Sequence, residues 1–359
     1  MSVRAGVVTA AGSAPELTEI VLAAPAVDEV LIRVAATGIC HTDISWAAGQ
    51  FGRSTEEFPI VLGHETSGVV EAVGRRDSPF KPGDRVVVAL THHCGVCRFC
   101  ERGQPVLCDH RNDRSPRIST TSGEPVWQSY GVGGFAEKAI VRASSLVIVP
   151  DDVPLETAAV IGCAVATGVG AVWNVAEVEP GSTVLVFGAG AVGVSVISGA
   201  AMAGAARIVA VEPNAERRSA ALALGATDAV DSTDESLAAL LESDRFDYAF
   251  ESAGKIATIE AAVRHTRRGG TITLIGAAPR GTMFSLYALD FVENHQRLLG
   301  CLAGGIRPHD DFPKLFAMYR RGILKLDAMI SATAPLSDIA GAFGRSQSAA
   351  GLRTVVVPG

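Results

Sequence analysis

The chain has 359 residues, of which 48% are hydrophobic and 19% are charged. That length exceeds one ordinary hydrophobic core, so we expect two domains with a large apolar interior. The formal net charge of −7 argues against nucleic acid or an anionic membrane surface as the main partner. Six of the seven cysteines stand near other potential metal ligands rather than in a disulfide framework, and no segment resembles a secretory signal. Both features favour a reducing, cytoplasmic setting.

Residues 1 to about 36 contain short β-branched runs separated by Pro and Gly, which predict a mostly β N-terminal region. The first reactive cluster follows as CHTD at residues 40–43, and GHE at residues 63–65 lies in a predicted turn between apolar runs. Taken singly, this second histidine is more often structural, and Cys163 is more often a small buried hydrophobe. Taken together, Cys40, His64 and Cys163 form a Cys₂His set, which is the ligand set of a catalytic zinc with an open fourth position.

A loop rich in Gly, Arg and polar residues carries four cysteines in the pattern C-x₂-C-x₂-C-x₇-C: Cys94, Cys97, Cys100 and Cys108. Four thiolates so close together are typical of a closed zinc site whose binding energy fixes an otherwise unstructured lobe. An iron–sulfur cluster is the competing interpretation, but the fourth cysteine of a bacterial ferredoxin follows after three residues and precedes a proline. Here Asp109 follows Cys108, so structural zinc is favoured. We interpret His92 and His93 as solvated neighbours of this loop and not as ligands.

The stretch from residue 183 to residue 212 organises the middle of the chain. An apolar run at Thr183–Phe187 predicts a buried strand, which leads into GAGAVG at residues 188–193 and then an Ala-rich helix to about Ala203. A second strand is predicted at Ile208–Val211 and ends on the acidic Glu212.

This pattern predicts a dinucleotide-binding turn. Gly188 permits the sharp turn off the strand, Gly190 permits close approach of a pyrophosphate, and Gly193 permits tight packing of the helix. The helix N-terminus offers N–H groups and a positive dipole end to the phosphates. Glu212 is placed to accept hydrogen bonds from an adenosine ribose.

Two uncharged stretches, Val184–Ala206 and Thr157–Ala176, are long enough to span a bilayer. Neither has flanking Lys/Arg asymmetry or aromatic belts, and both are dominated by Gly, Ala and Val. We interpret them as buried segments of an α/β core and expect no membrane partner.

The assembled motifs resemble a zinc-containing alcohol dehydrogenase of the medium-chain dehydrogenase/reductase family. The resemblance covers almost the whole chain and rests on seven motifs in the family's order. They are CHTD (40–43), GHE (63–65), the four-cysteine lobe (94–108), GCAVATG (162–168), GAGAVG (188–193), VEPNAER (211–217) and GLRTVVV (351–357).

The resemblance implies an α/β fold with two domains. A GroES-like, β-rich catalytic domain at residues 1–152 carries the structural zinc lobe at about 90–112. A Rossmann-type, doubly wound parallel sheet follows at 153–302, and the C-terminal segment 303–359 returns to the catalytic domain. Predicted strands at Asp228–Val230, Asp247–Glu251 and Thr271–Ile275 agree with this sheet.

The resemblance also implies roles near the metal. Cys40, His64 and Cys163 match the ligands of the catalytic zinc, and Asp43 matches the partner of the ligand histidine. Glu65 resembles the acid placed close behind the zinc, and Thr42 matches the hydroxyl residue that hydrogen-bonds the substrate oxygen. With the four-cysteine lobe, the resemblance implies two zinc ions per subunit.

Further matches concern the cofactor. His41 and Arg353 resemble pyrophosphate contacts, Arg217 resembles a basic residue near the adenosine ribose, and Thr167 resembles a residue beside the nicotinamide. Val192 in the glycine turn and Ile275 at a strand end complete the expected contacts, together with Gly188, Gly190, Gly193 and Glu212. Zinc then lowers the pKa of a bound alcohol, Thr42 passes its proton on, and a hydride moves to the nicotinamide.

Two departures limit this transfer. Many members place a histidine at the end of the proton relay, where this chain has Ser45; serine is no base near neutral pH, so the relay ends at water or at His41. The ribose position carries Glu212 instead of the commoner Asp. An acid repels a 2′-phosphate, so NAD(H) is preferred, while Arg217 and Arg218 keep NADP(H) possible.

By position, four residues are candidates for the substrate pocket, although each is as readily an ordinary core side chain: Trp46, Leu90, Tyr130 and Leu302. They favour a medium-sized apolar or aromatic alcohol, or its carbonyl counterpart. The alternatives are a reductase of conjugated carbonyl or iminium substrates, a dehydrogenase of thiol adducts of formaldehyde, and a non-catalytic nucleotide- or zinc-binding module. The resemblance implies a homodimer or homotetramer formed through the cofactor domains.

Overall fold

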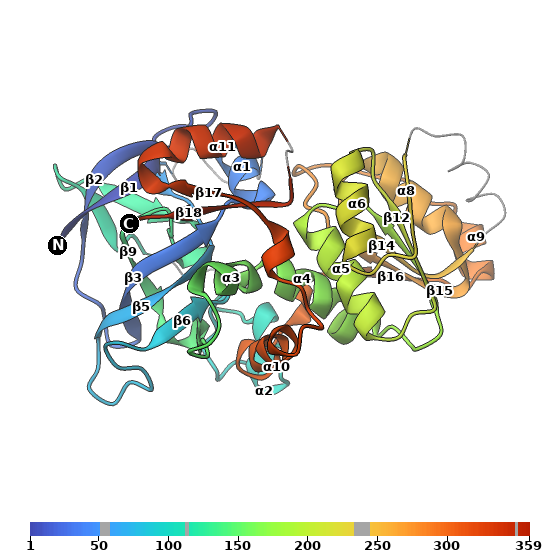
Figure 1. Cartoon of the computed structure of the whole chain (residues 1–359), viewed down its shortest axis with the longest axis horizontal. Coiled ribbons are helices and arrows are strands. Elements are labelled where there is room, and N and C mark those ends of the chain that lie inside the picture. Colours follow the sequence, from blue (N-terminus) through green and yellow to red (C-terminus); the bar gives the residue numbers. More distant parts are fainter. Residues whose placement is uncertain (51–57, 112–114, 233–244, 349–350) are drawn as a thin grey trace. The chain divides into compact units, whose positions relative to one another are not determined.

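The computed structural model describes residues 1–50, 58–111, 115–232, 245–348 and 351–359. The chain forms two compact units (Figure 1). The first joins Met1–Cys163 to Arg307–Gly359, and the second comprises Ala164–Ile306. The chain therefore enters the second unit after Cys163 and leaves it after Ile306, whereas the sequence placed these transitions after residues 152 and 302.

The first unit is built on a closed barrel and a seven-stranded sheet. In spatial order the barrel strands are β1 (Ser2–Val8), β2 (Glu16–Leu22), β7 (Ile118–Thr120), β8 (Pro125–Gln128) and β4 (Ile60–Val61). The sheet runs β10 (Leu146–Ile148), β6 (Arg85–Val88), β5 (Glu65–Val73), β3 (Glu29–Gly38), β18 (Arg353–Val357) and β17 (Ile330–Pro335), with β9 (Lys138–Arg142) also paired to β3. Because β18 pairs antiparallel with β3, the C-terminal segment completes a sheet that the N-terminal part begins.

The central strand β3 shows why this sheet forms. Its sequence EVLIRVAATG is rich in β-branched and small residues, and nearly all of its side chains are buried. Apolar clusters pack around Phe135 and Ile60 on one side and around Val30 and Val86 on the other. The helices of this unit are α1 (His41–Ala47), α2 (Arg98–Glu101), α3 (Leu155–Ala159), α10 (Pro308–Arg320) and α11 (Ile339–Gln347).

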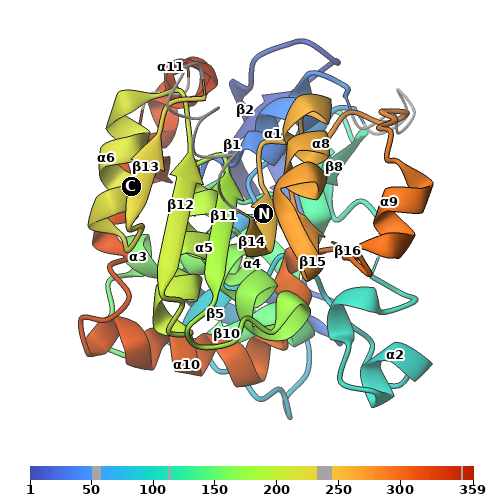
Figure 2. The same ribbon diagram turned by 90° about the vertical axis from the view of Figure 1, so that its right-hand side faces the viewer.

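The second unit contains a six-stranded, fully parallel sheet. Its order is β13 (Asp228–Val230), β12 (Arg207–Val211), β11 (Thr183–Phe187), β14 (Phe246–Glu251), β15 (Thr266–Leu274) and β16 (Arg297–Gly300). Chain order reverses direction between β11 and β14, and ligands bind at such a switch point, beyond the carboxyl ends of the strands. Figure 2 faces this sheet, with α6 (Ala215–Ala223) beside the edge strand β13.

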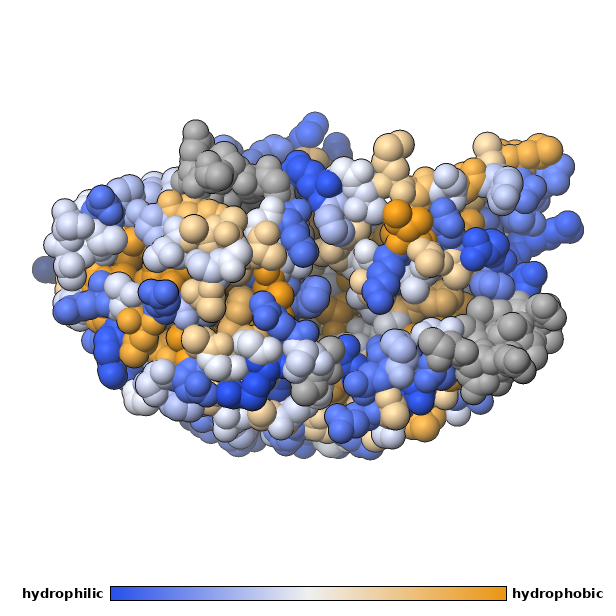
Figure 3. Space-filling model, turned by 90° about the horizontal axis from the view of Figure 1, so that it is seen from above, coloured by the Kyte–Doolittle hydropathy of each residue, from blue (hydrophilic) through white to orange (hydrophobic). Residues whose placement is uncertain are grey.

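Among the described residues, the other α-helices of the second unit are α4 (Ala164–Gly170), α5 (Ala191–Met202), α8 (Ile256–His265) and α9 (Ala288–Glu293), and a π-helical stretch at Ala171–Ala176 follows α4. The predicted strands occur within a residue or two of their expected ends, except that β15 begins earlier, at Thr266. Figure 3 shows one face of the molecule, on which apolar side chains surface only in patches among hydrophilic ones.

The two membrane-length stretches are interrupted in the structure. Val184–Ala206 divides into β11 and α5, and α5 has 12 residues. Within the described residues no single helix is long and apolar enough to cross a membrane, although Leu155–Gly162 and Ala164–Ala176, a pair bent by 51°, would pass by length and composition alone.

Candidate active site

Three ligand-type side chains meet inside the first unit. The ligand atoms of Cys40, His64 and Cys163 all lie within 4.8 Å of one another, and all three residues are buried. Cys40 caps the N-terminus of α1, His64 lies between β4 and β5, and Cys163 follows a short helical turn after α3. Three segments that are far apart in the sequence thus deliver one Cys₂His group.

Asp43 holds this group in place. One carboxylate oxygen, Oδ2, accepts the backbone N–H of Cys40 at 3.0 Å, which also closes the first turn of α1. The other, Oδ1, accepts the N–H of Gly63 and lies 3.0 Å from Nδ1 of His64. A carboxylate can only accept, so Nδ1 carries the proton and the lone pair of the ring is on Nε2, the atom that ligates metal.

The donor set fits a zinc ion. Nε2 of His64 is buried without a hydrogen bond of good geometry in the described part of the chain. A hydrogen bond from Cys163 lowers the pKa of the Cys40 thiol well below its usual value, and the same contact raises the pKa of Cys163. Burial opposes protonation of His64, but the carboxylate of Asp43 and the sulfur of Cys40 raise its pKa well above the usual value. Two thiolates and one imidazole are a catalytic zinc set that leaves one position open.

Glu65 and Arg353 form a fully enclosed ion pair directly behind the Cys₂His group. Nε of Arg353 lies 3.0 Å from Oε2 of Glu65, and its Nη1 donates to the carbonyl oxygen of Ile39 at 2.5 Å. Burial raises the pKa of Glu65 to about 7 even though Arg353 opposes that shift. A Cβ on Gly38 would stand 2.3 Å from Oε2 of Glu65, so the carboxylate fills space that only glycine leaves.

The remaining predicted residues of this region lie on α1. His41 is exposed, Thr42 is partly buried and Ser45 is buried. Thr42 and His41 follow Cys40 directly, which keeps both on the first turn beside the metal group. Their roles toward substrate, proton and pyrophosphate stay predictions, as does that of Arg353 toward the pyrophosphate.

The four cysteines of the lobe also gather: Cys94, Cys97, Cys100 and Cys108 have sulfur atoms within 4.8 Å of one another. Backbone N–H groups of Cys94 and His110 both point at Sγ of Cys108, at 3.3 Å. Burial raises the pKa of the Cys108 thiol, and these two N–H···S bonds oppose that shift. Hydrogen bonds from the backbone at Cys100 and Asp109 lower the pKa of Cys97 to about 6. This arrangement fits a closed tetrahedral zinc site. Residue 112, the expected end of the lobe, lies outside the described residues.

The expectation for one neighbour of the lobe is wrong. His92 is not solvated: it is buried, and its Nε2 donates to the carbonyl oxygen of His110 at 3.0 Å. That bond fixes the chain beside Cys108, so His92 supports the lobe from behind. His93 is partly buried, with its ring 6.0 Å from that of His309.

The glycine turn of the second unit has the geometry that a pyrophosphate requires. Gly188 has φ +88°, and a Cβ on Gly193 would stand 1.9 Å from the carbonyl oxygen of Gly188. Gly190 caps the N-terminus of α5, and a Cβ there would meet only Nη1 of Arg217, at 4.0 Å. The first N–H groups of α5, including those of Val192 and Gly193, have no partner within the helix. The turn therefore fits a bound phosphate.

Glu212 lies where β12 ends and is buried. Its Oε2 accepts the N–H of Ala189 at 2.8 Å, and its Oε1 accepts the N–H of Asn214 at 3.0 Å. The carboxylate thus joins the glycine turn to the start of α6 and keeps further lone pairs for a ribose. Thr167 is buried in α4, and Ile275, predicted at a strand end, follows β15 and donates to the carbonyl oxygen of Glu251 at 2.8 Å.

Comparison with known proteins decides the family. Residues 26–151 match the alcohol dehydrogenase GroES-like domain, and residues 191–321 match the zinc-binding dehydrogenase domain. The chain is 34% identical to S-(hydroxymethyl)glutathione dehydrogenase from Escherichia coli O6:H1 (strain CFT073), over 99% of this chain and 100% of the relative.

The chain belongs to the zinc-containing alcohol dehydrogenases of the medium-chain dehydrogenase/reductase family. It is therefore a zinc-dependent oxidoreductase, and the expected fold class is confirmed. Two solved structures agree. An alcohol dehydrogenase zinc-binding domain protein from Burkholderia ambifaria superimposes with a TM-score of 0.93 at 33% identity over 100% of both chains. Benzyl alcohol dehydrogenase from Acinetobacter calcoaceticus does so with a TM-score of 0.91 at 31% identity over 99% of both chains.

One aromatic ring lies beside the Cys₂His group of this dehydrogenase, and a second ring packs against the first. The ring of Tyr130 lies 5.0 Å from that of His64 and 5.3 Å from that of Trp46, which it meets edge-on. Tyr130 has φ +51°, a conformation that costs a bulky residue energy and that its packing here maintains. We call Trp46 and Tyr130 the aromatic wall. Leu90 is buried and donates its N–H to Gly162, while Leu302 belongs to the second unit and is 41% exposed.

The sequence missed two residues that lie beside the glycine turn. Oγ of Ser252 donates to the carbonyl oxygens of Phe187 and Gly188, both at 3.0 Å, and so fixes the turn from below. Glu251 accepts the N–H groups of Ala253 and Gly254. Both follow or end β14, next to β11 in the sheet, so the rule that ligands bind at strand ends was the signal that could have found them.

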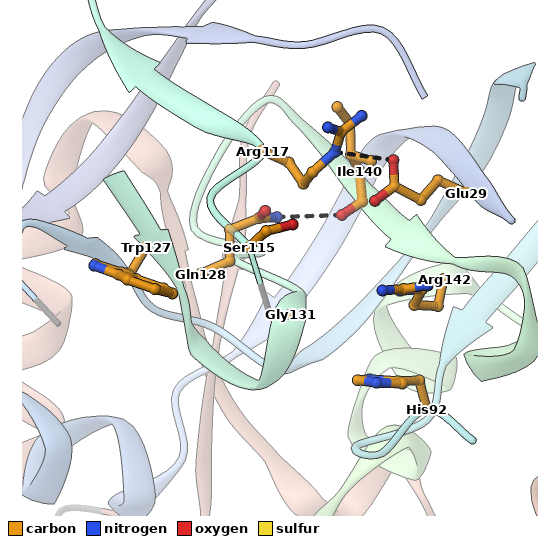
Figure 4. A pocket seen from close by; sticks show the side chains of 9 residues that line it. All are labelled: Glu29, His92, Ser115, Arg117, Trp127, Gln128, Gly131, Ile140 and Arg142. Carbon is orange, nitrogen blue, oxygen red and sulfur yellow. Dashed lines mark hydrogen bonds and ion pairs between the residues drawn. The ribbon is translucent and has the colours of Figure 1, made fainter. Parts of the chain in front are cut away.

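A separate hollow lies in the first unit of the dehydrogenase (Figure 4). It is lined by Glu29, His92, Ser115, Arg117, Trp127, Gln128, Gly131, Ile140 and Arg142. Several polar groups of its lining bond to one another. Nε of Arg117 donates to Glu29 at 3.0 Å, and the side-chain amide of Gln128 donates to the carbonyl oxygen of Ile140 at 3.2 Å. Within the described part of the chain, the predicted site residues do not line it.

Proposed function

We propose that this dehydrogenase transfers a hydride between NAD(H) and a medium-sized apolar or aromatic alcohol, or the matching aldehyde or ketone. The aromatic wall carries the choice of substrate class. Trp46 and Tyr130 give the Cys₂His group an apolar, ring-shaped neighbour, and aromatic pairs favour edge-on or offset contacts with a further ring. The benzyl alcohol dehydrogenase with the same fold supports this choice.

We assign two zinc ions to the chain, a catalytic one to the Cys₂His group and a structural one to the four-cysteine lobe. When bound, the catalytic ion supplies Lewis acidity toward the substrate oxygen. Asp43 keeps Nδ1 of His64 protonated, and Glu65 with Arg353 supplies a buried charge pair behind the metal group. Thr42 accepts the hydrogen bond of the substrate hydroxyl and passes the proton on. Ser45 is no base near neutral pH, so the proton leaves to water or to His41.

We propose that the second unit binds the dinucleotide, with residues 188–193 at the pyrophosphate and Glu212 at the adenosine ribose. The geometry in support is the space above Gly190 and the buried carboxylate at the end of β12. Thr167, Val192, Arg217 and Ile275 are the further contacts. NAD(H) is preferred, because a carboxylate at the ribose repels a 2′-phosphate.

We also propose a cytoplasmic homo-oligomer assembled through the cofactor unit. None of the seven cysteines, all of them among the described residues, forms a disulfide, which suits a reducing compartment. The segment that precedes the edge strand β16 exposes several large apolar side chains, which favour burial against a second copy: Met283 at 84%, Tyr287 at 78%, Leu289 at 67% and Val292 at 73%. The catalytic role belongs to the first unit and the cofactor role to the second.

The test is a rate measurement on purified, zinc-loaded protein. Aliphatic, benzylic and terpenoid alcohols and the glutathione adduct of formaldehyde are each supplied with NAD⁺ or NADP⁺, and reduced nicotinamide is followed by absorbance. Each active pair is repeated after chelation of the metal. We expect chelator-sensitive reduction of NAD⁺ with benzylic alcohols as the best class.

Two other outcomes separate the alternatives. The glutathione adduct as the best substrate would move the specificity toward that of the Escherichia coli relatives. Silence with every alcohol, from protein that binds zinc and NAD⁺, would contradict alcohol oxidation and lead to the reductive test with conjugated carbonyl or iminium substrates and NADPH. Absence of activity in that test as well would favour the non-catalytic nucleotide- or zinc-binding module.

A further inference from the structure

Two consecutive arginines begin α6 next to the ribose position, and the fold treats them differently. Nη1 of Arg217 lies near Gly190, on the side of the glycine turn. Arg218 points elsewhere: its Nη1 donates to the carbonyl oxygens of Glu212 and Pro213, at 2.9 and 2.8 Å. The same nitrogen donates to Oδ2 of Asp231, which directly follows β13, at 2.8 Å.

Three acceptors surround Nη1 of Arg218 and fix the position of its guanidinium group. Two of them are backbone carbonyls at the end of β12, so the side chain caps that strand. The third is a carboxylate, which neutralises the charge of the guanidinium; the side chains of Arg218 and Asp231 are only 23% and 26% exposed. A partly buried, charge-assisted contact of this kind holds an arginine better than an exposed ion pair does.

This matters for the choice of cofactor. NAD(H) and NADP(H) differ by a phosphate on the 2′ position of the adenosine ribose, and enzymes that accept the phosphate place an arginine there with donors to spare. Arg218 begins at the right place, six residues after Glu212, but Asp231 and the two carbonyls already engage it. A 2′-phosphate would have to draw the guanidinium away from a carboxylate that already balances its charge.

We propose that Asp231 is a positioning residue for cofactor selectivity: it holds Arg218 against the end of β12 and so withholds a cation from the 2′ position. This inference rests on the proposed binding of NAD(H) by the second unit and deepens it. Glu212 repels the 2′-phosphate directly, and Asp231 withholds Arg218, one of two adjacent arginines that could offset the repulsion. Selectivity for NAD(H) is then the product of two carboxylates on neighbouring strands.

The two contributions are separable because they act through different atoms. With Glu212 in place, releasing Arg218 from Asp231 increases the affinity for a 2′-phosphate only a little, since the carboxylate of Glu212 still faces the phosphate. With the charge of Glu212 removed, the position of Arg218 decides whether the phosphate finds a partner. The effects of the two substitutions on 2′-phosphate binding should therefore be more than additive, as for residues that share a partner.

The test measures binding of adenosine 5′-monophosphate and adenosine 2′,5′-bisphosphate to the full-length, zinc-loaded protein by calorimetry. The variants are Glu212→Gln, Asp231→Ala, the double variant, and the double variant with Arg218→Gln. We expect Asp231→Ala to tighten bisphosphate binding about fivefold in the Glu212→Gln background, the size of one modest ion pair, and less in the wild-type background. Arg218→Gln should abolish that gain. Glu212→Gln itself removes a ribose contact and weakens binding of the monophosphate, so the monophosphate is compared only between variants that share the same residue 212, where its affinity should stay within about twofold.

Asp228→Ala is the matched control, because Asp228 lies on the same strand β13 and pairs with Arg207 at 3.3 Å instead of with α6. An equal gain from Asp228→Ala, or a gain that survives Arg218→Gln, would overturn the inference. Absence of a gain from Asp231→Ala in a protein that binds the monophosphate would also overturn it while leaving the proposed function intact. Failure of wild-type protein to bind the monophosphate would instead contradict the proposed cofactor site.

Discussion

The two groups of side chains that could hold a metal ion in this chain are built in opposite ways. Cys40, His64 and Cys163 come from three distant segments, are at most 7% exposed, and depend on the packed core for their positions. The four cysteines of the lobe lie within residues 94–108, on and around the short helix α2, and are mostly half-buried. The sulfur of Cys108 receives two backbone N–H groups. Three donors leave a position for substrate, whereas four donors close the coordination shell.

This difference suggests a catalytic role for the Cys₂His group and a structural role for the lobe. The Cys₂His group needs a rigid scaffold and a second residue, Asp43, to orient its histidine, as expected where geometry governs a reaction. We propose that bound metal takes the place of an apolar core in the lobe, three of whose four cysteines are only partly buried. Substitutions in the Cys₂His group should therefore lower turnover, whereas substitutions in the lobe should lower the stability of the fold.

The largest effect on turnover is expected from Cys163→Ser. Replacing a buried thiolate ligand with a weaker oxygen donor should empty the catalytic site and lower turnover on the order of a thousandfold, because Lewis acidity toward the substrate is lost. The four-cysteine lobe should keep its zinc. Steady-state rates measure the loss of turnover, and binding of adenosine 5′-monophosphate shows whether the cofactor unit is still folded. Unchanged turnover would contradict the assignment of the metal group.

Asp43→Asn should have the next largest effect. An amide in place of the carboxylate keeps the shape but loses the charge that fixes the proton on Nδ1 of His64. We expect zinc affinity at the Cys₂His group to fall between about 10- and 100-fold. Competition with a metallochromic chelator measures it. An affinity equal to that of wild type would show that the histidine needs no such partner.

Tyr130→Leu should alter selectivity more than rate. Loss of the ring that faces His64 and Trp46 removes edge-on aromatic contact, so kcat/KM for benzyl alcohol should fall about tenfold relative to a linear alcohol of similar size. Leu90→Ile, a volume-conserving change at another predicted pocket residue, serves as the control. Equal loss with both alcohols would indicate disruption of the fold and not of an aromatic site.

Cys108→Ser should have the smallest effect on turnover per folded molecule and the clearest effect on stability. Cys108 is the fully buried member of the lobe, and its sulfur takes two backbone N–H groups. Without its zinc the loop loses what organises it, so we expect a lower midpoint of thermal unfolding and faster proteolysis near residues 94–108. Thermal scans at matched zinc concentration and limited proteolysis check this; unaltered unfolding would contradict a structural role.

The sequence predicted the parts of this molecule that depend on local spacing. The four-cysteine lobe and the glycine turn are both contiguous, and their residue types leave few alternatives. The buried metal group was also predicted, although its members are far apart, because their types complete a known ligand set. The parallel sheet followed from apolar runs of strand length between helical stretches.

What the sequence did not reveal depends on contacts between distant segments. Nothing in the composition around Tyr130 signals its positive φ or its packing against His64. The burial of His92 depends on the carbonyl of His110, and the grip of Asp231 on Arg218 depends on how β13 and α6 come together. Such contacts are set by tertiary packing, which overrides any single-residue expectation.

The most direct test is a zinc count made alongside the rate measurement. Wild-type protein, Cys163→Ser and Cys108→Ser are analysed by elemental mass spectrometry after dialysis. The account predicts two zinc ions per chain in the wild type and one in each variant, with turnover lost in Cys163→Ser and retained by the folded fraction of Cys108→Ser. A Cys163→Ser protein that keeps both zinc ions and its turnover, or a Cys108→Ser protein that is folded but inactive, would contradict the division of labour between the two groups.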